Sequence, residues 1–126
     1  MQYYDLFVDA DGESHFRDIP VALTEKIFAP PAKAIEISET ASATGMLFLR
    51  LRAGWNEPIH PTPVIQSLIC LRGRVRVTAS DGDTREIGPG DVWRMADTHG
   101  KGHHTEVIST EDFECVITQH PTPETP

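Results

Sequence analysis

The residues best suited to chemistry stand at fixed intervals between Gly54 and Gly73. Five residues separate Gly54 from His60, one separates His60 from Thr62, three separate Thr62 from Gln66, and six precede Gly73. Imidazole can bind Zn, Ni, Cu, Fe or Mn, or transfer a proton, whereas the glutamine amide is a neutral and weak oxygen donor. This segment is the first candidate for a functional site.

A second polar segment, residues 96–104, supplies further candidates. His103 and His104 are adjacent, so in a strand they face opposite sides, and we expect His104 on the surface or in an interface. Asp97 precedes a threonine in a turn-rich stretch, which favours a loop-capping carboxylate over a general base. His99 and Lys101 can close over a binding site or remain solvated loop residues, and the sequence leaves their roles open.

Composition limits the classes of partner. The chain has 126 residues, a usual size for one domain, and carries 11 Lys and Arg against 19 Asp and Glu, a net charge of -8. This charge opposes binding to nucleic acid and to anionic membranes. No apolar run is long enough to span a bilayer and no leader pattern begins the chain, so we expect no membrane partner and a cytoplasmic location.

Two cysteines, Cys70 and Cys115, are too far apart for a metal knuckle and too few for a disulfide scaffold. Both lie in apolar runs, as is typical of reduced core residues, and nothing local would lower a thiol pKa. We assign them no role, and we expect no organic cofactor.

Period-two patterning along the chain predicts an all-β fold. We expect a turn at residues 9–14 and a strand at 64–71 that is covered on both faces, because nearly all its residues are apolar. Periodicity alone leaves a small barrel and a two-sheet jelly roll open. The other expected strands are residues 3–8, 21–28, 34–38, 45–53, 74–78, 84–87, 92–95, 103–108 and 113–119.

The frame from Gly54 to Gly73 resembles the first motif of the cupins, which reads Gly, His-x-His, Glu, Gly. The resemblance continues in Ile87-Gly-Pro-Gly-Asp-Val92, similar to the turn that opens the second cupin motif, and in Asp97-Thr-His-Gly-Lys-Gly-His103, similar to small single-domain bacterial cupins. It implies a jelly-roll barrel, a double-stranded β-helix, in one domain of residues 1–119. The motif core covers about 45–118, strands within 1–38 are candidates for dimer contact, and the proline-rich residues 120–126 form a loose tail.

The resemblance also implies where a site would lie. His60, Gln66 and His103 would point into the barrel as ligands of a divalent Zn, Ni, Fe or Mn ion, held weakly or absent, since Thr62 and Gln66 replace the usual histidine and glutamate. The alternative is a metal-free pocket in which Gln66 and His60 bond each other or water. Trp55 can equally wall the pocket, join the core or join a dimer. The expected pocket residues are Trp55, Thr62, Leu68 and Thr105.

Two functional classes follow from the resemblance. One is a metal-dependent enzyme of isomerase, lyase or dioxygenase type acting on a small molecule, with catalytic roles not assigned to individual residues. The other is a ligand-binding or sensing cupin without metal or turnover. In either case the resemblance implies a small-molecule partner and a homodimer, with Tyr3, Tyr4 and Phe7 as interface candidates.

Overall fold

The chain folds into strands and turns, and the computed structural model describes residues 1–123. No helix occurs in that range, so none of the described residues forms a helix able to span a membrane. The strands are β1 (Gln2–Val8), β2 (Ser14–Pro20), β3 (Thr24–Lys26), β4 (Ile35–Ile37), β5 (Gly45–Leu51), β6 (Gln66–Arg72), β7 (Val75–Ala79), β8 (Thr84–Ile87), β9 (Val92–Met95), β10 (His103–Val107) and β11 (Phe113–Gln119).

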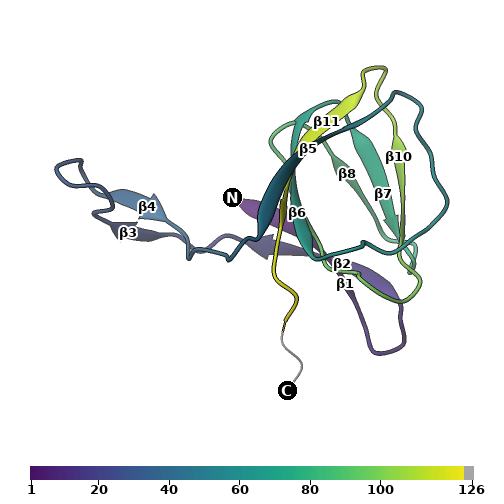
Figure 1. The fold of residues 1–126 in the computed structure, drawn as a ribbon, viewed down its shortest axis with the longest axis horizontal. Coiled ribbons are helices and arrows are strands. Elements are labelled where there is room, and N and C mark those ends of the chain that lie inside the picture. The colour runs from purple at the N-terminus through teal and green to yellow at the C-terminus, as the bar shows by residue number, and fades with distance from the viewer. Residues whose placement is uncertain (124–126) are drawn as a thin grey trace.

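Two sheets enclose the core. A six-stranded sheet has the order β2-β1-β9-β6-β11-β5, and a three-stranded sheet has the order β10-β7-β8. Single bridges at Asn56 and His60 extend the smaller sheet beyond β10. In Figure 1 these strands form the rounded body of the molecule, with β7, β8 and β10 facing β5, β6 and β11. This arrangement is the jelly-roll barrel that the sequence predicts.

Alternation decides which side chains reach the interior. In β7 the buried residues Val75, Val77 and Ala79 alternate with outward-facing ones, and β11 repeats this pattern. Because successive strand residues point to opposite faces, the inward set forms one continuous apolar layer. Its centre holds the fully buried Trp93 and Phe113.

The turn before β9 forms as its residues predict. Gly90 has φ of 88° and its N–H donates to Cys70 O at 3.0 Å, while Asp91 Oδ2 accepts from Gly88 N–H at 2.9 Å. Glycine adopts positive φ without steric cost, and the aspartate satisfies a backbone donor in the turn. The turn returns the chain into the six-stranded sheet beside β6.

The N-terminal third differs from the expected strand pattern. The strand expected at 21–28 is reduced to Thr24–Lys26, and β2 occupies Ser14–Pro20, where the sequence pattern predicted no strand. Polar residues obscure the period of β2, yet pairing with β1 and the buried Phe16 stabilise it. Tyr3, Tyr4 and Phe7 are half-buried in β1, which lies between β2 and β9.

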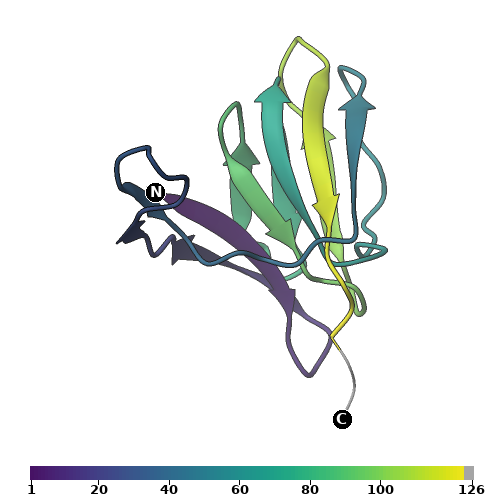
Figure 2. The ribbon, with the colours of Figure 1, turned by 60° about the vertical axis from the view of Figure 1, so that its left-hand side comes forward.

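The prediction that residues 64–71 are covered on both faces is wrong for the chain as described. Leu68 and Cys70 are buried on the inner face, but Ile69 and Leu71 are exposed on the outer face. Strands β3 and β4 form a separate two-stranded sheet that projects away from the body and leaves this face uncovered (Figures 1 and 2).

The start of the predicted tail is anchored. His120 donates its N–H to Ile65 O at 2.8 Å, and its ring nitrogens lie 2.8 Å from Ser67 Oγ and 2.7 Å from Ser42 O. Residues 121–123 follow without regular structure, and the rest of the predicted tail lies outside the described residues.

Candidate functional site

A cavity of about 250 Å³ lies between the two sheets and is lined by all seven residues that the sequence analysis selected. These are Trp55, His60, Thr62, Gln66, Leu68, His103 and Thr105. Most of the remaining lining is apolar and comes from the inner faces of β5, β9 and β11. The polar side chains therefore meet in an otherwise apolar pocket.

His60 and His103 lie side by side at this pocket because the two backbones pair. His60 N–H donates to His103 O and His103 N–H donates to His60 O, both at 3.0 Å, and the ring centroids are 5.4 Å apart. The two side chains differ in exposure: His103 is fully buried at the start of β10, whereas His60 is exposed.

Both imidazoles use Nδ1 to bond an oxygen. His60 Nδ1 lies 2.9 Å from Pro58 O, and His103 Nδ1 lies 2.6 Å from Asp97 Oδ2. These oxygens accept, so each Nδ1 carries a proton, and in the neutral ring each Nε2 keeps a free lone pair. The arrangement presents two lone pairs for a ligand proton or a metal ion.

Asp97 is the residue that fixes His103. Its carboxylate is completely buried, and besides His103 it accepts from Thr62 Oγ1 at 2.7 Å; its backbone carbonyl accepts from Thr62 N–H at 3.0 Å. The loop-capping role favoured by the sequence is therefore wrong, because the carboxylate accepts from side chains. Thr62, at the position of the missing histidine, orients this aspartate.

Gln66 also lines the pocket, but its side chain makes few hydrogen bonds. Its Nε2 lies 3.6 Å from Met95 Sδ, a weak contact, and within residues 1–123 no donor bonds its amide oxygen. The direct Gln66–His60 bond considered from the sequence is not formed. The amide is thus available to a ligand.

The donor set fits a divalent metal ion poorly. Residues 1–123 contain no cluster of three His, Cys, Asp or Glu side chains in a metal-binding arrangement. His60, His103 and Gln66 offer two imidazole nitrogens and one neutral oxygen, and the nearby Asp97 is already bonded twice. No carboxylate is left to offset the charge of the ion, so this set would hold one only weakly.

The loop that carries the site is held from outside by the β1–β2 turn. Ser14 Oγ donates to Gly102 O at 2.6 Å, Lys101 N–H donates to Gly12 O at 2.9 Å, and Lys101 Nζ pairs with Glu13. Lys101 is exposed and bonded to this turn, and His99 is exposed. The turn therefore supports the segment between Asp97 and His103.

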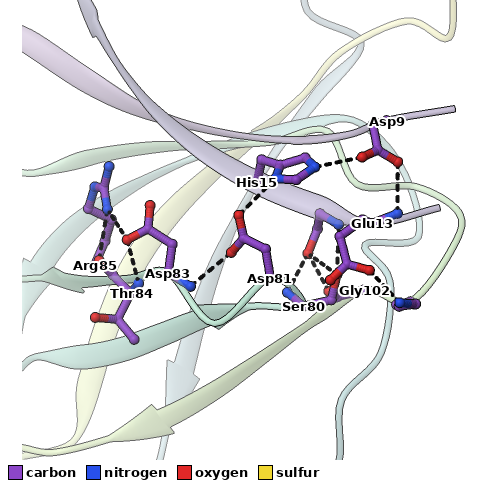
Figure 3. Close-up of polar contacts among 11 residues, drawn as sticks. Asp9, Glu13, His15, Ser80, Asp81, Asp83, Thr84, Arg85 and Gly102 are labelled. Atoms are coloured by element: carbon purple, nitrogen blue, oxygen red, sulfur yellow. Dashed lines mark hydrogen bonds and ion pairs between the residues drawn. The ribbon is translucent and has the colours of Figure 1, made fainter. Parts of the chain in front are cut away.

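His15 links the β1–β2 turn to the β7–β8 turn, as Figure 3 shows. His15 Nε2 lies 2.7 Å from Asp9 Oδ2, and His15 Nδ1 lies 2.7 Å from Asp81 Oδ2. Hydrogen bonds to Asp9 and then Asp81 raise the pKa of His15 above the ordinary 6.5. Both ring nitrogens are used, so His15 joins the two turns and offers no free lone pair.

The cysteines take no part in the site. Burial raises the pKa of Cys70 to about 11 and that of Cys115 to about 12, so both remain thiols near neutral pH. His104 Nε2 lies 2.6 Å from Asn56 Oδ1, away from the pocket lining.

Eight lining residues of the pocket were not selected from the sequence, and they include Trp93, Met95 and Phe113. Trp93 packs edge-on against His103 with centroids 5.3 Å apart, and its Nε1 is a buried donor without a partner among the described residues. Met95 and Phe113 complete the apolar wall. All three occupy inward positions of predicted strands, so the alternation places them in the interior, but no pattern assigns them to this pocket.

Comparison with known proteins is informative about the fold. No protein-family model and no curated protein match the sequence. Among solved structures, the Cnp3 cupin domain of Schizosaccharomyces pombe is 15% identical with a TM-score of 0.52, covering 96% of this chain and 88% of that one. A cupin 2 conserved barrel domain protein from Salinispora arenicola is 18% identical with a TM-score of 0.49, covering 79% of this chain and 75% of that one.

Proposed function

We propose that this chain, which has the cupin fold, binds a compact, largely apolar molecule that carries one weakly acidic hydroxyl or acid group. A phenol-sized ring represents the class. His60 and His103 would receive the polar group, and the remaining pocket would enclose the ring. The observation that carries the proposal is the pair of imidazoles with Nδ1 already bonded, in a pocket lined otherwise by apolar side chains.

The size and lining of the cavity support this ligand class. A dry cavity of roughly 150 Å³ accommodates benzene, so about 250 Å³ suits one ring with small substituents. Ligand pockets typically combine apolar walls with a few placed polar groups. Here the walls come from residues such as Leu49, Leu68 and Trp93, and the polar groups include His60, His103 and Gln66.

The two histidines are suited to a ligand that donates a proton or a hydrogen bond. A neutral Nε2 accepts a hydrogen bond or a proton from the ligand, and Asp97 stabilises the positive charge if His103 becomes protonated. Gln66 can add a donor or an acceptor through its amide. A ligand without a donor would leave both lone pairs unsatisfied in a partly desolvated site, which lowers its affinity.

Binding can be measured through the two tryptophans. The chain contains only Trp55 and Trp93, and both line the cavity, so their fluorescence reports occupancy. We expect phenol to bind at least about tenfold more tightly than toluene, which has a methyl group in place of the hydroxyl. Equal affinities for the two probes, or no saturable response to phenol, would contradict the proposal.

Two alanine variants test whether His60 contributes to ligand binding, one at His60 and a control at His104. His60→Ala removes one lone pair without disturbing the core, and we expect it to reduce the preference for phenol over toluene. His104→Ala is the control, since His104 adjoins His103 but does not line the cavity. Equal losses in both variants would show that the effect is not local to the pocket.

A metal-dependent enzyme of isomerase, lyase or dioxygenase type is the second candidate function. It is favoured by the Asp97–His103 contact, since metal-ligating histidines usually donate their second ring nitrogen to a carboxylate. His60, His103 and Gln66 would hold the ion, which would supply Lewis-acid chemistry. Elemental analysis of protein purified without chelators distinguishes the two candidates. Near-stoichiometric Zn, Ni, Fe or Mn that is lost in His60→Ala would favour the metal-dependent enzyme over the metal-free pocket.

A further inference from the structure

One residue of the pocket has a buried polar group without a partner. The indole Nε1 of Trp93 is buried, and within residues 1–123 no atom accepts its proton. It is the one buried side-chain nitrogen or oxygen in that range without a hydrogen bond. Buried tryptophan N–H groups usually find an acceptor, because an unsatisfied donor lowers stability. In the wall of a ligand pocket, such a donor indicates a group that a ligand can satisfy.

The strands on either side fix the position of Trp93. Strand β9 lies between β1 and β6, and the register pairs Trp93 with Tyr4 on one side and with Leu68 on the other. Trp93 and Met95 are the buried residues of this strand, and Trp93 is only 2% exposed. Close packing limits the rotation of the indole toward another partner, so the donor is held in place before a ligand arrives.

The indole is next to the histidine that the proposed ligand contacts. Trp93 packs edge-on against His103, with ring centroids 5.3 Å apart, and both residues line the same cavity. His103 bonds Asp97 through Nδ1, so its neutral ring offers a ligand only an acceptor, whereas the indole offers only a donor. A small molecule that reaches His103 therefore also lies beside a hydrogen-bond donor.

We propose that Trp93 selects ligands that have a carbonyl oxygen in addition to the acidic hydroxyl, which makes the ligand class the hydroxyaryl aldehydes and ketones. This inference rests on the proposed function, since it takes the histidines as the groups that receive the hydroxyl. The carbonyl oxygen accepts from Trp93 Nε1 while the hydroxyl donates to the histidine pair. Trp93 is then a specificity-determining residue that contacts the ligand directly.

Other acceptors suit this wall of the pocket less well. Its remaining side chains are apolar and include Leu68, Met95 and Phe113. A second hydroxyl would accept from the indole but would leave its own proton unpaired, and a carboxylate would bring a charge that one N–H cannot balance. A carbonyl oxygen has lone pairs and no proton. One ring with a small carbonyl substituent also suits a cavity of about 250 Å³.

Calorimetric titration with matched probes tests the role of Trp93. Hydroxyacetophenone and ethylphenol, each used as its meta and para isomers, have the same hydroxyl and similar shapes, but only the ketone has a carbonyl oxygen. We expect at least one ketone isomer to bind more tightly than its ethyl counterpart. Trp93→Phe removes the N–H and keeps an aromatic side chain, so it should reduce this preference at least about fivefold.

The ratio of the two affinities is the quantity to compare between proteins. The carbonyl also makes the ligand hydroxyl more acidic, and Trp93→Phe does not remove that effect. Trp55→Phe is the matched control, because Trp55 lines the same pocket without a buried, unpartnered nitrogen. Its affinities for ketone and ethyl compound should change by the same factor. A ketone preference that Trp93→Phe leaves unchanged, or that both variants reduce equally, would overturn the proposal.

Proton NMR of the unmodified chain tests the same bond without altering the core. The chain has two tryptophans, so it gives two indole N–H signals, which Trp55→Phe assigns. The ketone should move the Trp93 signal farther downfield than the ethyl compound does, since a hydrogen bond to oxygen deshields the proton. A Trp93 signal that both probes move alike would overturn the proposal.

The outcomes separate this inference from the proposed function. Phenol and toluene have no carbonyl, so their comparison tests the histidines alone. A preference for phenol over toluene, together with a ketone preference that does not depend on Trp93, would overturn the role of Trp93 and retain the histidine contact. Equal affinities for phenol and toluene, together with a ketone preference that Trp93→Phe removes, would retain the Trp93 contact and overturn the histidine contact.

Discussion

Two histidine–aspartate clusters in this molecule share almost the same bond length and differ in everything else. His103 lies 2.6 Å from Asp97 in the barrel interior, and His15 lies 2.7 Å from both Asp9 and Asp81 at the surface. The buried pair engages one ring nitrogen of its histidine and leaves the other free. The surface cluster engages both nitrogens.

The difference separates a chemical role from a structural one. A histidine with one nitrogen bonded to a carboxylate is oriented and can still accept a proton or a ligand. A histidine bonded by carboxylates at both nitrogens joins those two acidic groups, and it has no lone pair left for a ligand. Contact distance alone would not distinguish the two, whereas the number of free lone pairs does.

A hydrogen bond between residues next to the two histidines also links the two clusters. Ser14 adjoins His15, its hydroxyl donates to Gly102, and Gly102 precedes His103. The surface cluster therefore holds the turn that supports the loop of the buried one. Substitutions of the residues that link the clusters should show how strongly the stability of the buried cluster depends on the surface turn.

Gly102→Ala should have the largest effect. Gly102 has φ of 80°, and an added Cβ would lie 2.2 Å from the carbonyl carbon of His60. Backbone strain and overpacking together should cost about 4 kcal/mol of unfolding free energy, measured by urea denaturation. Gly82→Ala is the matched control, since φ is 93° with no atom within 4 Å of the added Cβ. Equal losses of unfolding free energy in the two variants would mean that the backbone at His60 does not pack tightly against Gly102.

Asp97→Ala should come next, at about 3 kcal/mol, because it leaves the buried His103 and Thr62 without an acceptor. Asp97→Asn should lose less stability but should still weaken phenol binding, since an amide cannot stabilise a protonated His103. The comparison is Asp81→Ala in the surface cluster, for which we expect a much smaller loss in the same urea titration. A comparable loss would remove the distinction between the clusters.

The sequence predicts the barrel fold and several of the pocket-lining residues, but it does not predict which side chains bond each other inside the barrel. The period-two alternation locates Leu68 and Trp93 in the interior because burial on a strand is a local property. The partnership of Asp97 with His103 and Thr62 depends on how two loops meet, which no local pattern encodes. The strand β2 was missed because its polar residues obscure the alternation, although it pairs with the adjacent β1. The exposed outer face of β6 was missed because an apolar run does not reveal whether another segment covers it.

Ser14→Ala should have an intermediate effect. Ser14 is fully buried, its Oγ donates to Gly102 O and accepts from Ser80 N–H at 2.7 Å, and its own N–H donates to Ser80 Oγ at 2.7 Å. Losing the hydroxyl leaves a buried carbonyl and an N–H unsatisfied, which should cost about 2 kcal/mol. Ser109→Ala, at an exposed turn that also bonds backbone, is the control for urea denaturation. If phenol binding also weakens in Ser14→Ala, the surface turn influences the pocket.

The smallest effect concerns the surface cluster and depends on pH. The groups that face His15 are Asp9 and Asp81, and their bonds raise its pKa in the folded chain above 6.5. A raised pKa in the folded state means that folding favours the protonated histidine, so its stabilisation is complete below 6.5 and disappears as the pH rises through the folded value.

We therefore compare urea midpoints of the unmodified chain and His15→Asn between pH 5.5 and 9, as a range about the ordinary histidine pKa. Their difference should be greatest at the acidic end and should shrink toward zero at the alkaline end. It should also shrink in 1 M salt, which screens charges over about 3 Å. A difference that is constant across this range would show that His15 stabilises the turns through packing against Phe7 rather than through its charge, and the surface cluster would then resemble the buried one more closely than its geometry implies.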